Sequence, residues 1–368
     1  MIEKRFFLMI MCLFIFIIGI NAQNINTAIS LPEGFSIDMY TDQVPGARTI
    51  RMSDNGTLFV STREIGKVYA VKDTDGNNTG DKVYTIASGL NMPNGIDLKD
   101  GDLYVAEVQR LIRFNNIEQN LENPPEPEKV YTDLPRYSDH GWRYIGFGPQ
   151  GNLHIAIGAP CNVCLRENEI FASIAKFNSD YNNLTVIAHG IRNSVGFDWH
   201  PNSGKLWFTD NGRDYLGDNR PPDELNKLSR EGQHFGFPYL HGKTVWDPQF
   251  GNQGKDKSFT KPAIELGPHV AALGMEFYDG DMFPEKYRGS VFIAEHGSWN
   301  RSVPIGYRIS FVKVEENEAK KYSTFAEGWL RGANAWGRPV DVEVLNDGSL
   351  LVSDDRRGAV YRITYSGE

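Results

Sequence analysis

SDHGWRYIGFGPQGNLHIAIG, residues 138–158, is the stretch of this chain that decides its fold. Residues 142–147 are rich in aromatic and β-branched side chains, residues 149–152 read PQGN, and residues 153–157 alternate large apolar side chains with smaller or polar ones. Such a sequence predicts a β-hairpin, in which a tight turn joins two antiparallel strands. His140 stands directly before the first strand.

Five further segments repeat this two-strand unit, with an apolar strand, a turn that contains glycine and a second strand that ends in polar residues. The six units together span residues 47–64, 94–108, 140–158, 192–212, 273–297 and 338–355. Each is followed by a third short strand signal, at residues 66–71, 109–114, 173–177, 223–228, 307–314 and 358–363. Repeats of roughly 40 to 50 residues with several strands each are typical of β-propellers. The chain is therefore predicted to be an all-β, six-bladed β-propeller.

Two segments interrupt the repeats without suggesting a second domain. Residues 229–268 are rich in Gly, His, Pro and Phe and lack strand periodicity, and residues 120–129 are polar and proline-rich. Both are predicted to be loops, and the longer one is expected on a face where propellers carry function. Residues 23–368 are thus predicted to form a single propeller domain.

The first 22 residues are expected to be a secretory signal peptide. Lys4 and Arg5 precede an apolar run over residues 6–20, and Ala22 follows it, which is the pattern of such a leader with cleavage after Ala22. The alternative is a membrane anchor, but the run is shorter than the about 20 residues that span a bilayer. The mature protein is therefore expected to be exported, either to the periplasm or out of the cell.

Charge and cysteine content narrow the range of partners. The formal net charge is −9, and becomes −10 once residues 1–22 are removed, and an acidic surface argues against nucleic acid as a partner. Cys161 and Cys164 stand in PCNVC. In an exported protein this pair is expected to form a disulfide, with a free thiol pair as the alternative. Zinc would need two more ligands, and covalent haem would need a histidine where Leu165 stands.

The propeller architecture brings particular residues together. The innermost strands line the central channel, and in an antiparallel pair the start of the first strand lies beside the end of the second. The residues expected at one mouth of the channel are Arg63, Glu64, Asn94, Glu107, His140, Arg192, Asn193, Asp210, Asn211, Glu295, His296, Arg338, Asp354, Asp355 and Arg356.

Two explanations fit this charged ring. Ion pairs would close the mouth of the channel, or the ring would bind a charged ligand. Arginines suit carboxylates, the backbone of residues 210–212 (DNG) suits a hard cation, and His140 suits a base near neutral pH. This mixture favours a polyanionic cofactor held by arginines and calcium.

These residues lie in a pattern that resembles a known family, the quinoprotein sugar dehydrogenases of the glucose and sorbosone dehydrogenase type. Members are six-bladed propellers that bind pyrroloquinoline quinone (PQQ) and calcium. The resemblance covers residues 31–365 and is carried by an ordered set of segments, namely HGWRYIGFGPQGNLHIAIG (140–158), GIRNSVGFDWHP (190–201), TDNGRD (209–214), PPDELN (221–226), EHGSWNRS (295–302) and GRPVDV (337–342). Each segment is weak alone, whereas the whole set in this order is specific.

The resemblance implies roles for individual residues. His140 would be the general base that takes the proton of the sugar hydroxyl while hydride passes to the quinone. Arg192 and Asn193 match an Arg-Asn pair that contacts the cofactor, and Arg338 matches an arginine that pairs with a quinone carboxylate. The family pattern also implies that calcium, which polarises the quinone, is bound by the backbone carbonyls of Gly212 and Arg213, and that a cofactor loop contains His296, Asn300 and Arg301.

One departure from the family pattern concerns the orientation of the base. In the glucose dehydrogenase branch a carboxylate that orients the base follows the IG at the end of this hairpin, and here that position is Ala159. Another group must therefore orient His140, and a preference for glucose is not carried over. The chain looks closer to the sorbosone and pyranose dehydrogenase branches.

The remaining polar and aromatic residues have simpler interpretations. His154 and His200 are expected to be structural. Asp223 and Glu224 would hold a second, structural calcium or be solvated carboxylates. Trp142, Trp199 and Trp207 are expected to pack between blades. Trp246, Trp299 and Trp336 are predicted to lie in loops, where they would either pack within the loop or stack on a sugar or quinone.

The sequence thus predicts a quinoprotein that oxidises an aldose, pyranose or sorbosone-like sugar with PQQ and calcium, and passes electrons to an external acceptor such as a cytochrome or a quinone. Two alternatives stay open. A calcium-dependent sugar lactonase on the same fold would group Glu64, Asn94, Asn193 and Asp210 around one metal. A non-enzymatic extracellular binding propeller would use the same mouth to bind a peptide or a glycan.

Overall fold

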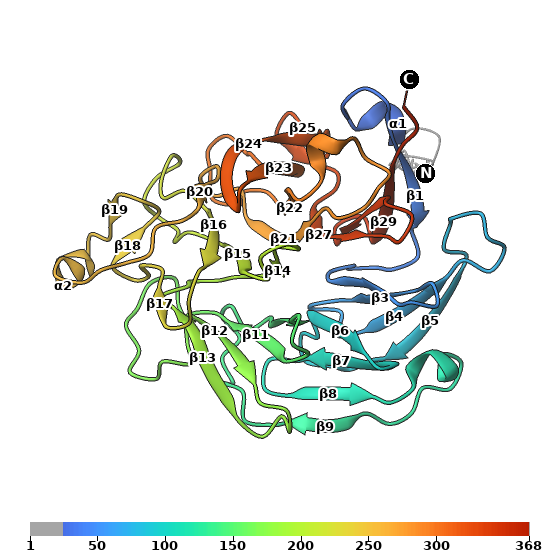
Figure 1. The fold of residues 1–368 in the computed structure, drawn as a ribbon, viewed down its shortest axis with the longest axis horizontal. Coiled ribbons are helices and arrows are strands. Elements are labelled where there is room, and N and C mark those ends of the chain that lie inside the picture. Colours follow the sequence, from blue (N-terminus) through green and yellow to red (C-terminus); the bar gives the residue numbers. More distant parts are fainter. Residues whose placement is uncertain (1–24, 368) are drawn as a thin grey trace, which may run out of the picture.

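The computed structural model describes residues 25–367, so the predicted signal peptide over residues 1–22 lies outside the described residues. The described chain forms six sheets of four or five strands around a central axis (Figure 1). The predicted all-β, six-bladed propeller is therefore confirmed. We number the blades 1 to 6 in chain order, starting from the blade that contains β2.

Each blade has four antiparallel strands. Blade 1 consists of β2 (Ile50–Met52), β3 (Thr57–Ser61), β4 (Val68–Lys72) and β5 (Lys82–Ala87), and blade 2 of β6 (Gly95–Lys99), β7 (Asp102–Ala106), β8 (Leu111–Phe114) and β9 (Glu128–Tyr131). Blade 3 consists of β10 (Tyr144–Phe147), β11 (Leu153–Ile157), β12 (Ser173–Phe177) and β13 (Leu184–His189), and blade 4 of β14 (Phe197–Trp199), β15 (Leu206–Asp210), β16 (Glu224–Leu228) and β20 (Ile264–Glu265). Blade 5 consists of β21 (Ala272–Phe277), β22 (Val291–Glu295), β23 (Arg308–Glu315) and β24 (Glu318–Glu327), and blade 6 of β27 (Pro339–Val344), β28 (Leu350–Asp354), β29 (Ala359–Tyr365) and β1 (Phe35–Thr41).

Short elements complete the described structure. They are the β17 strand (Gln233–His234), which adds a parallel fifth strand to blade 3, the hairpins of β18 (Leu240–His241) with β19 (Val245–Trp246) and of β25 (Leu330–Arg331) with β26 (Asn334–Ala335), the helices α1 (Ile25–Ala28) and α2 (Gly251–Gly254), and the 3-10 helices η2 (Ile117–Asn120) and η3 (Glu285–Tyr287). Within residues 25–367, no helix is long and apolar enough to cross a membrane.

The hairpin of blade 3 forms as its sequence predicts. Tyr144 pairs with Ala156 and Phe147 pairs with Leu153, so the turn falls on residues 148–152. Gly151 adopts a left-handed φ of 78°, which glycine tolerates and side chains with a Cβ rarely adopt. The local chemistry of PQGN therefore fixes this turn and with it the register of the hairpin.

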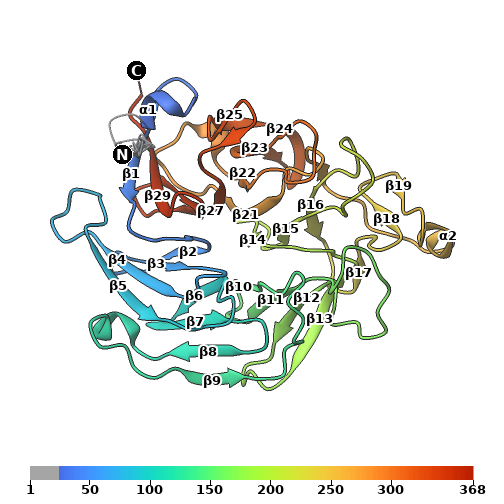
Figure 2. The ribbon, with the colours of Figure 1, turned by 180° about the vertical axis from the view of Figure 1, so that it is seen from behind.

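The fourth strand of each blade is absent from the sequence prediction. These outer strands are short or half-exposed; β5, for example, buries only Ile86 among its six residues. Blade 6 takes its fourth strand from the other end of the chain, because β1 pairs with β29 (Figure 2). This pairing joins the N-terminal strand to the last repeat, so that the two ends of the described chain meet in one blade and close the ring.

A buried ion cluster lies on the inner strands near the axis. Arg51 on β2 contacts Asp341 at 3.4 Å and Glu343 at 3.1 Å on β27, and Asp97 on β6 at 3.6 Å. Burial raises the pKa of Asp341 to about 6 and that of Glu343 to about 7, although Arg51 lowers both pKa values. This one guanidinium therefore links the inner strands of blades 1, 2 and 6.

The long insertion over residues 229–268 folds at the rim of the ring. Its hairpin of β18 with β19 and its helix α2 lie outside blades 3 and 4, where both views of the ribbon show them (Figures 1 and 2). The insertion is more structured than the predicted loop, because it contributes β17 to blade 3, β20 to blade 4 and a hairpin of its own.

Candidate active site

A polar pocket of about 290 Å³ lies where the inner-strand ends of five blades converge. Its volume is at the lower end of the range for small-molecule sites. The pocket is lined by Arg48, Arg63, His140, Trp142, Arg192, Asn193, Asn211, Gly212, Asp214, Asp223, His269, Ala271, Leu273, His296, Gly297, Trp299, Asn300 and Arg338. No residue of the insertion over residues 229–268 is among them, so the expectation that this segment forms the functional face is wrong for the pocket wall.

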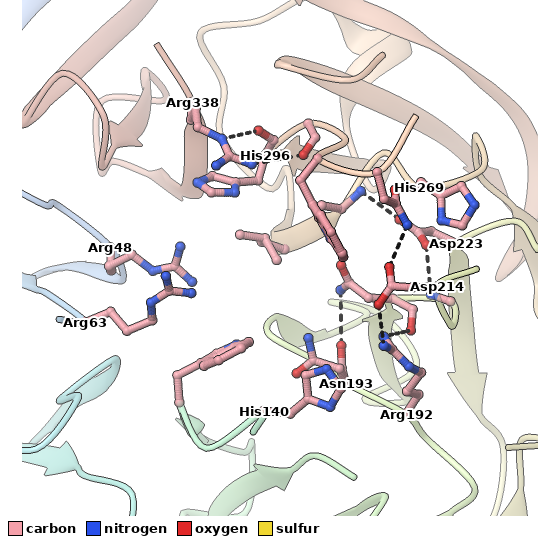
Figure 3. A pocket seen from close by; sticks show the side chains of 18 residues that line it. Arg48, Arg63, His140, Arg192, Asn193, Asp214, Asp223, His269, His296 and Arg338 are labelled. Carbon is pink, nitrogen blue, oxygen red and sulfur yellow. Dashed lines mark hydrogen bonds and ion pairs between the residues drawn. The ribbon is translucent and has the colours of Figure 1, made fainter. Parts of the chain in front are cut away.

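Most of the predicted site residues meet in this pocket. His140, Arg192, Asn193, His296 and Arg338 approach it from four blades (Figure 3), and Gly212 lines it as well. The side chains of two predicted residues are directed elsewhere. The Arg213 guanidinium pairs with Asp247 at 2.6 Å, and the Arg301 guanidinium donates to the carbonyls of Val303 and Asp218.

The backbone of blade 3 orients the imidazole of His140. Its Nδ1 lies 2.7 Å from the carbonyl oxygen of Ala159. A carbonyl only accepts hydrogen bonds, so Nδ1 carries the proton and Nε2 is left as the acceptor. A Cβ on Gly158 would lie 2.5 Å from the Cβ of His140, so glycine at this position allows the close approach. The Ala159 carbonyl is thus the group that orients the His140 ring.

The protonation of His140 differs from the expectation of a base near neutral pH. Burial, followed by the positive charge of Arg192, lowers the pKa of His140 to about 3, and the hydrogen bond to Ala159 offsets only part of this change. The imidazole is therefore neutral over the whole physiological pH range. Its Nε2 is therefore unprotonated at physiological pH, but the low pKa makes it a weak base in the free protein.

Trp142 lines the pocket and also packs between blades as predicted, because it contacts the apolar cluster of Val195, Leu273 and Val340 from blades 4, 5 and 6. Its ring stands edge-on to the His140 ring, with centroids 5.7 Å apart and an interplanar angle of 90°. The guanidinium of Arg63 lies 4.8 Å from the centre of the indole ring. Trp142 therefore contacts both the His140 ring and the Arg63 guanidinium. Trp299 is a second pocket tryptophan, 65% exposed.

Arg192 is held by loops of blades 3 and 4. Its Nε donates to the carbonyl of Asn162 at 2.8 Å, and its Nη2 donates to Asn162 Oδ1 at 2.9 Å and to Asp214 Oδ2 at 3.0 Å. Asn300 in turn donates to Asp214 Oδ1 at 2.7 Å. Because Arg192 is only 5% exposed and is fixed by these partners, its charge has a defined position at the pocket wall.

The opposite wall holds further cationic groups. Arg338 donates from Nε to the carbonyl of His296 and from Nη2 to that of Gly297, both at 3.0 Å. Asp355 lies 2.9 Å from His296 Nε2 and 3.1 Å from the Arg48 guanidinium. Burial lowers the pKa of His296 to about 4 although Asp355 raises it, and His296 and Arg48 hold the pKa of Asp355 well below its usual range against burial, which raises it.

The sequence predicted Arg63 at the pocket but did not predict Arg48. Arg63 stands in the predicted ring of strand ends, whereas Arg48 is missing from it. A signal for Arg48 exists in the repeats, since it precedes the first strand of its unit as Arg192 and Arg338 precede theirs. Asp214, Asp223 and His269 also line the pocket, and they stand in loops or at strand starts outside the repeat alignment of the inner hairpins.

Buried carboxylates support the segment around Gly212. Asp223 accepts from the amides of Gly212 at 2.8 Å and Ala271 at 2.7 Å, and Glu224 accepts from the amide of Gly242. Burial raises the pKa of Asp223 to about 6 and that of Glu224 to about 8. Both side chains are almost fully buried, so their interpretation as solvated carboxylates is wrong, and the second calcium stays a prediction.

None of the six strand-end acids of the predicted ring lines the pocket. Glu107 pairs with Arg110, Glu295 pairs with Arg308 at 2.7 Å, and Asp354 accepts from the amide of Arg338 at 2.9 Å. Because the Cβ direction alternates along a strand, strand ends that meet at one mouth do not all direct their side chains into it. These acids stabilise the turns that surround the pocket.

The donor set of the pocket fits a polycarboxylate and a hard cation. The guanidinium groups of Arg48, Arg63, Arg192 and Arg338 line one cavity, and guanidinium groups bind carboxylates with paired hydrogen bonds. Arg338 forms no ion pair with a carboxylate of the described chain. Within residues 25–367, no donor is bonded to the backbone carbonyls of Gly212 and Arg213, and unpaired carbonyl oxygens suit calcium.

Comparisons with known proteins show what the chain is similar to. The chain is 36% identical over 363 residues to an uncharacterized protein of Borreliella burgdorferi, covering 95% of this chain and 94% of that protein. It is 24% identical over 234 residues to the PQQ-dependent pyranose dehydrogenase of Coprinopsis cinerea, covering 48% of this chain but only 31% of that protein.

Solved structures share the fold. The PQQ domain of pyranose dehydrogenase from Coprinopsis cinerea superposes with a TM-score of 0.77 at 19% identity, covering 91% of this chain and 97% of that one. The PQQ-bound aldose sugar dehydrogenase from Streptomyces coelicolor superposes with a TM-score of 0.67 at 19% identity, covering 92% and 100%. The family model of the glucose/sorbosone dehydrogenases matches residues 109–362. The chain therefore belongs to the glucose/sorbosone dehydrogenase family.

Proposed function

We propose that this protein is a PQQ- and calcium-dependent dehydrogenase that oxidises an aldose, a pyranose or a sorbosone-like sugar, with His140 as the general base. The observation that carries the proposal is the joint position of a neutral, backbone-oriented histidine and four guanidinium groups on one pocket. A base and a carboxylate-binding wall in one cavity are what such a reaction needs.

The cofactor would be held mainly by Arg192, Asn193 and Arg338, with His296 beside them. Calcium would be bound by the carbonyls of Gly212 and Arg213. Arg301 would contribute from outside, because its hydrogen bonds to Val303 and Asp218 fix the loop that carries Trp299 and Asn300. When bound, PQQ supplies the oxidant that takes hydride from the sugar carbon.

His140 would accept the proton of the sugar hydroxyl at Nε2. The Nδ1–H bond to the Ala159 carbonyl would strengthen as the ring becomes positive, because a hydrogen bond from a charged donor is stronger than one from a neutral donor. Since the pKa of His140 in the free protein is about 3, proton acceptance alone is unfavourable. Proton transfer would therefore accompany the loss of hydride from the carbon rather than precede it.

The chain would work outside the cytoplasm and pass its electrons to an external acceptor, a cytochrome or a quinone. The apolar run over residues 6–20 and the disulfide between Cys161 and Cys164 support export. The disulfide confirms the predicted pairing of these cysteines. Residues 1–22 would be removed and residues 23–368 would form the mature enzyme.

The lactonase alternative is not favoured by the geometry. Glu64 is 70% exposed on its side chain and lies outside the pocket lining, Asn94 is buried and bonded to Arg48, and Asp210 accepts from the amides of Arg192 and Asn193. Among the described residues, the one group of three acidic, His or Cys side chains close enough to share a metal is Asp73, Asp75 and Asp81 in a surface loop. It has no counterpart inside the pocket.

The proposed function is tested by dye reduction across a panel of sugars. Purified residues 23–368, loaded with PQQ and calcium, should reduce an artificial acceptor with at least one aldose, pyranose or sorbosone. A matched sample without sugar gives the background rate. Dye reduction that does not exceed this background with any sugar of the panel would contradict the proposal and favour the binding propeller.

A further inference from the structure

The segment between β11 and β12 carries two contacts to the proposed machinery. We call residues 159–164 the disulfide loop, because Cys161 and Cys164 are bonded to each other within it. At its start, the Ala159 carbonyl accepts the hydrogen bond from His140. Between the two cysteines, Asn162 accepts hydrogen bonds from Arg192. One short loop thus touches both the proposed base and a proposed cofactor arginine.

Asn162 accepts two of the four hydrogen bonds that the Arg192 guanidinium donates. Its backbone carbonyl accepts from Arg192 Nε at 2.8 Å, and its Oδ1 accepts from Arg192 Nη2 at 2.9 Å. The same Oδ1 accepts from the backbone amide of Asp214 at 2.8 Å, and Asp214 pairs with Arg192 at 3.0 Å. Asn162 therefore fixes the guanidinium and also the carboxylate that neutralises it.

The disulfide is placed to fix Asn162 rather than to stabilise the whole fold. The two cysteines are separated by three positions, and the stabilisation that a disulfide gains from the unfolded chain grows with the length of the loop it closes. Residues 158–172 contain no strand or helix, so the backbone of Asn162 has no sheet to hold it. The disulfide joins a cysteine before Asn162 to a cysteine after it, and so supplies the missing constraint.

We propose that Asn162 is a positioning residue for PQQ binding, acting through Arg192, and that the Cys161–Cys164 disulfide keeps it in place. This inference rests on the proposed function, since it names how one of the cofactor arginines is oriented. Asn162 does not line the pocket itself. Because Asn162 would act only through the position of Arg192, its replacement is expected to change the affinity for PQQ.

The test is a titration of the metal-loaded apoprotein with PQQ, read by the quinone absorbance, in the wild type and in matched variants. Asn162→Ala removes the Oδ1 acceptor, and a hydrogen bond to a charged group is expected to change the dissociation constant by about tenfold or more. Asn162→Asp keeps an acceptor at that position and is expected to restore binding to within about threefold. Asn168→Ala, an exposed asparagine of the same segment that bonds only to local backbone, is the control.

Cys161→Ser with Cys164→Ser tests the role of the disulfide. The double variant is expected to bind PQQ about tenfold more weakly, by the same hydrogen-bond argument. Treatment of the wild type with a dithiol should do the same. In that treatment two electrons and two protons from the dithiol convert the disulfide to two thiols, and the dithiol becomes a cyclic disulfide. The dithiol treatment also gives a result if the double variant does not fold.

The outcomes separate this inference from the proposed function. If the wild type does not bind PQQ, both the proposed function and this inference fail. If the wild type binds but Asn162→Ala binds as tightly as Asn168→Ala, only the inference fails. It also fails if Asn162→Asp does not restore binding, because the loss would then reflect general damage to the loop. A melting temperature for each apoprotein shows whether that damage is present.

Discussion

Replacement of His140 by asparagine tests the proposed base with the least disturbance to the pocket. His140 has a φ of 47°, a left-handed conformation that asparagine adopts more readily than most residues. The asparagine Nδ2 can take the place of imidazole Nδ1 and keep the hydrogen bond to the Ala159 carbonyl. The substitution then removes Nε2, the atom that would accept the proton, and little else.

The expected effect is large on the rate and small on binding. General base catalysis contributes about a hundredfold to ten-thousandfold, which corresponds to about 3 to 5 kcal/mol in activation free energy. His140 is not among the proposed cofactor ligands, so PQQ affinity should change by less than about threefold. The assay is the single-turnover reduction of bound quinone by saturating sugar, with the PQQ dissociation constant measured in parallel.

The pH dependence gives a second test of the same residue. Because the pKa of His140 is lowered to about 3, the imidazole stays neutral from pH 5 to pH 8. The pH profile of kcat/KM for the wild type should therefore show no ionisation of His140 in that range. A loss of less than tenfold in His140→Asn, or an ionisation near pH 6.5 that disappears in the variant, would refute this reasoning.

Three further predictions concern the pocket, the pH dependence of stability and the axis. Arg338→Gln should weaken PQQ binding by about tenfold to a hundredfold in a titration, through loss of a charge-assisted contact, while Arg331→Gln at an exposed site should not. Burial lowers the pKa of His154 to about 4, so protonation of the unfolded chain should lower the free energy of unfolding by about 1 to 2 kcal/mol between pH 7 and pH 5, and urea denaturation of His154→Gln should show a shallower acid slope. Arg51→Met should lower the free energy of unfolding by about 3 to 5 kcal/mol, because it leaves buried carboxylates unpaired. The loss should be larger at pH 8 than at pH 5, because burial raises the pKa of Glu343 to about 7 and this group ionises between these pH values. Equal losses at both pH values would contradict the assignment of this cluster.

The fold was predictable because its inner hairpins repeat strong local signals. Turn residues such as PQGN and a glycine near each turn fix the register, and six copies define the blade number. The outer strands were not predictable in the same way, because half-exposed strands such as β5 carry weak patterns. The closure by β1 depends on a contact between the two ends of the described chain, which no local pattern encodes.

The site was predictable where a residue has a fixed place in the repeat. His140, Arg192, Asn193 and Arg338 stand at the starts of first strands and do line the pocket. The direction of a side chain at a strand end was not predictable, and for this reason Glu295 was wrongly expected at the mouth. The contacts of Trp142 with His140 and of Asn162 with Arg192 depend on irregular loop geometry that sequence patterns do not specify.

The measurement that tests the central claim most directly is a titration of metal-free residues 23–368 with PQQ, with and without calcium, followed by addition of sugar. The account predicts tight binding that requires calcium, a rise in melting temperature because the ligand binds only the folded state, and reduction of the bound quinone by at least one aldose, pyranose or sorbosone. Absence of PQQ binding under both metal conditions would contradict the account.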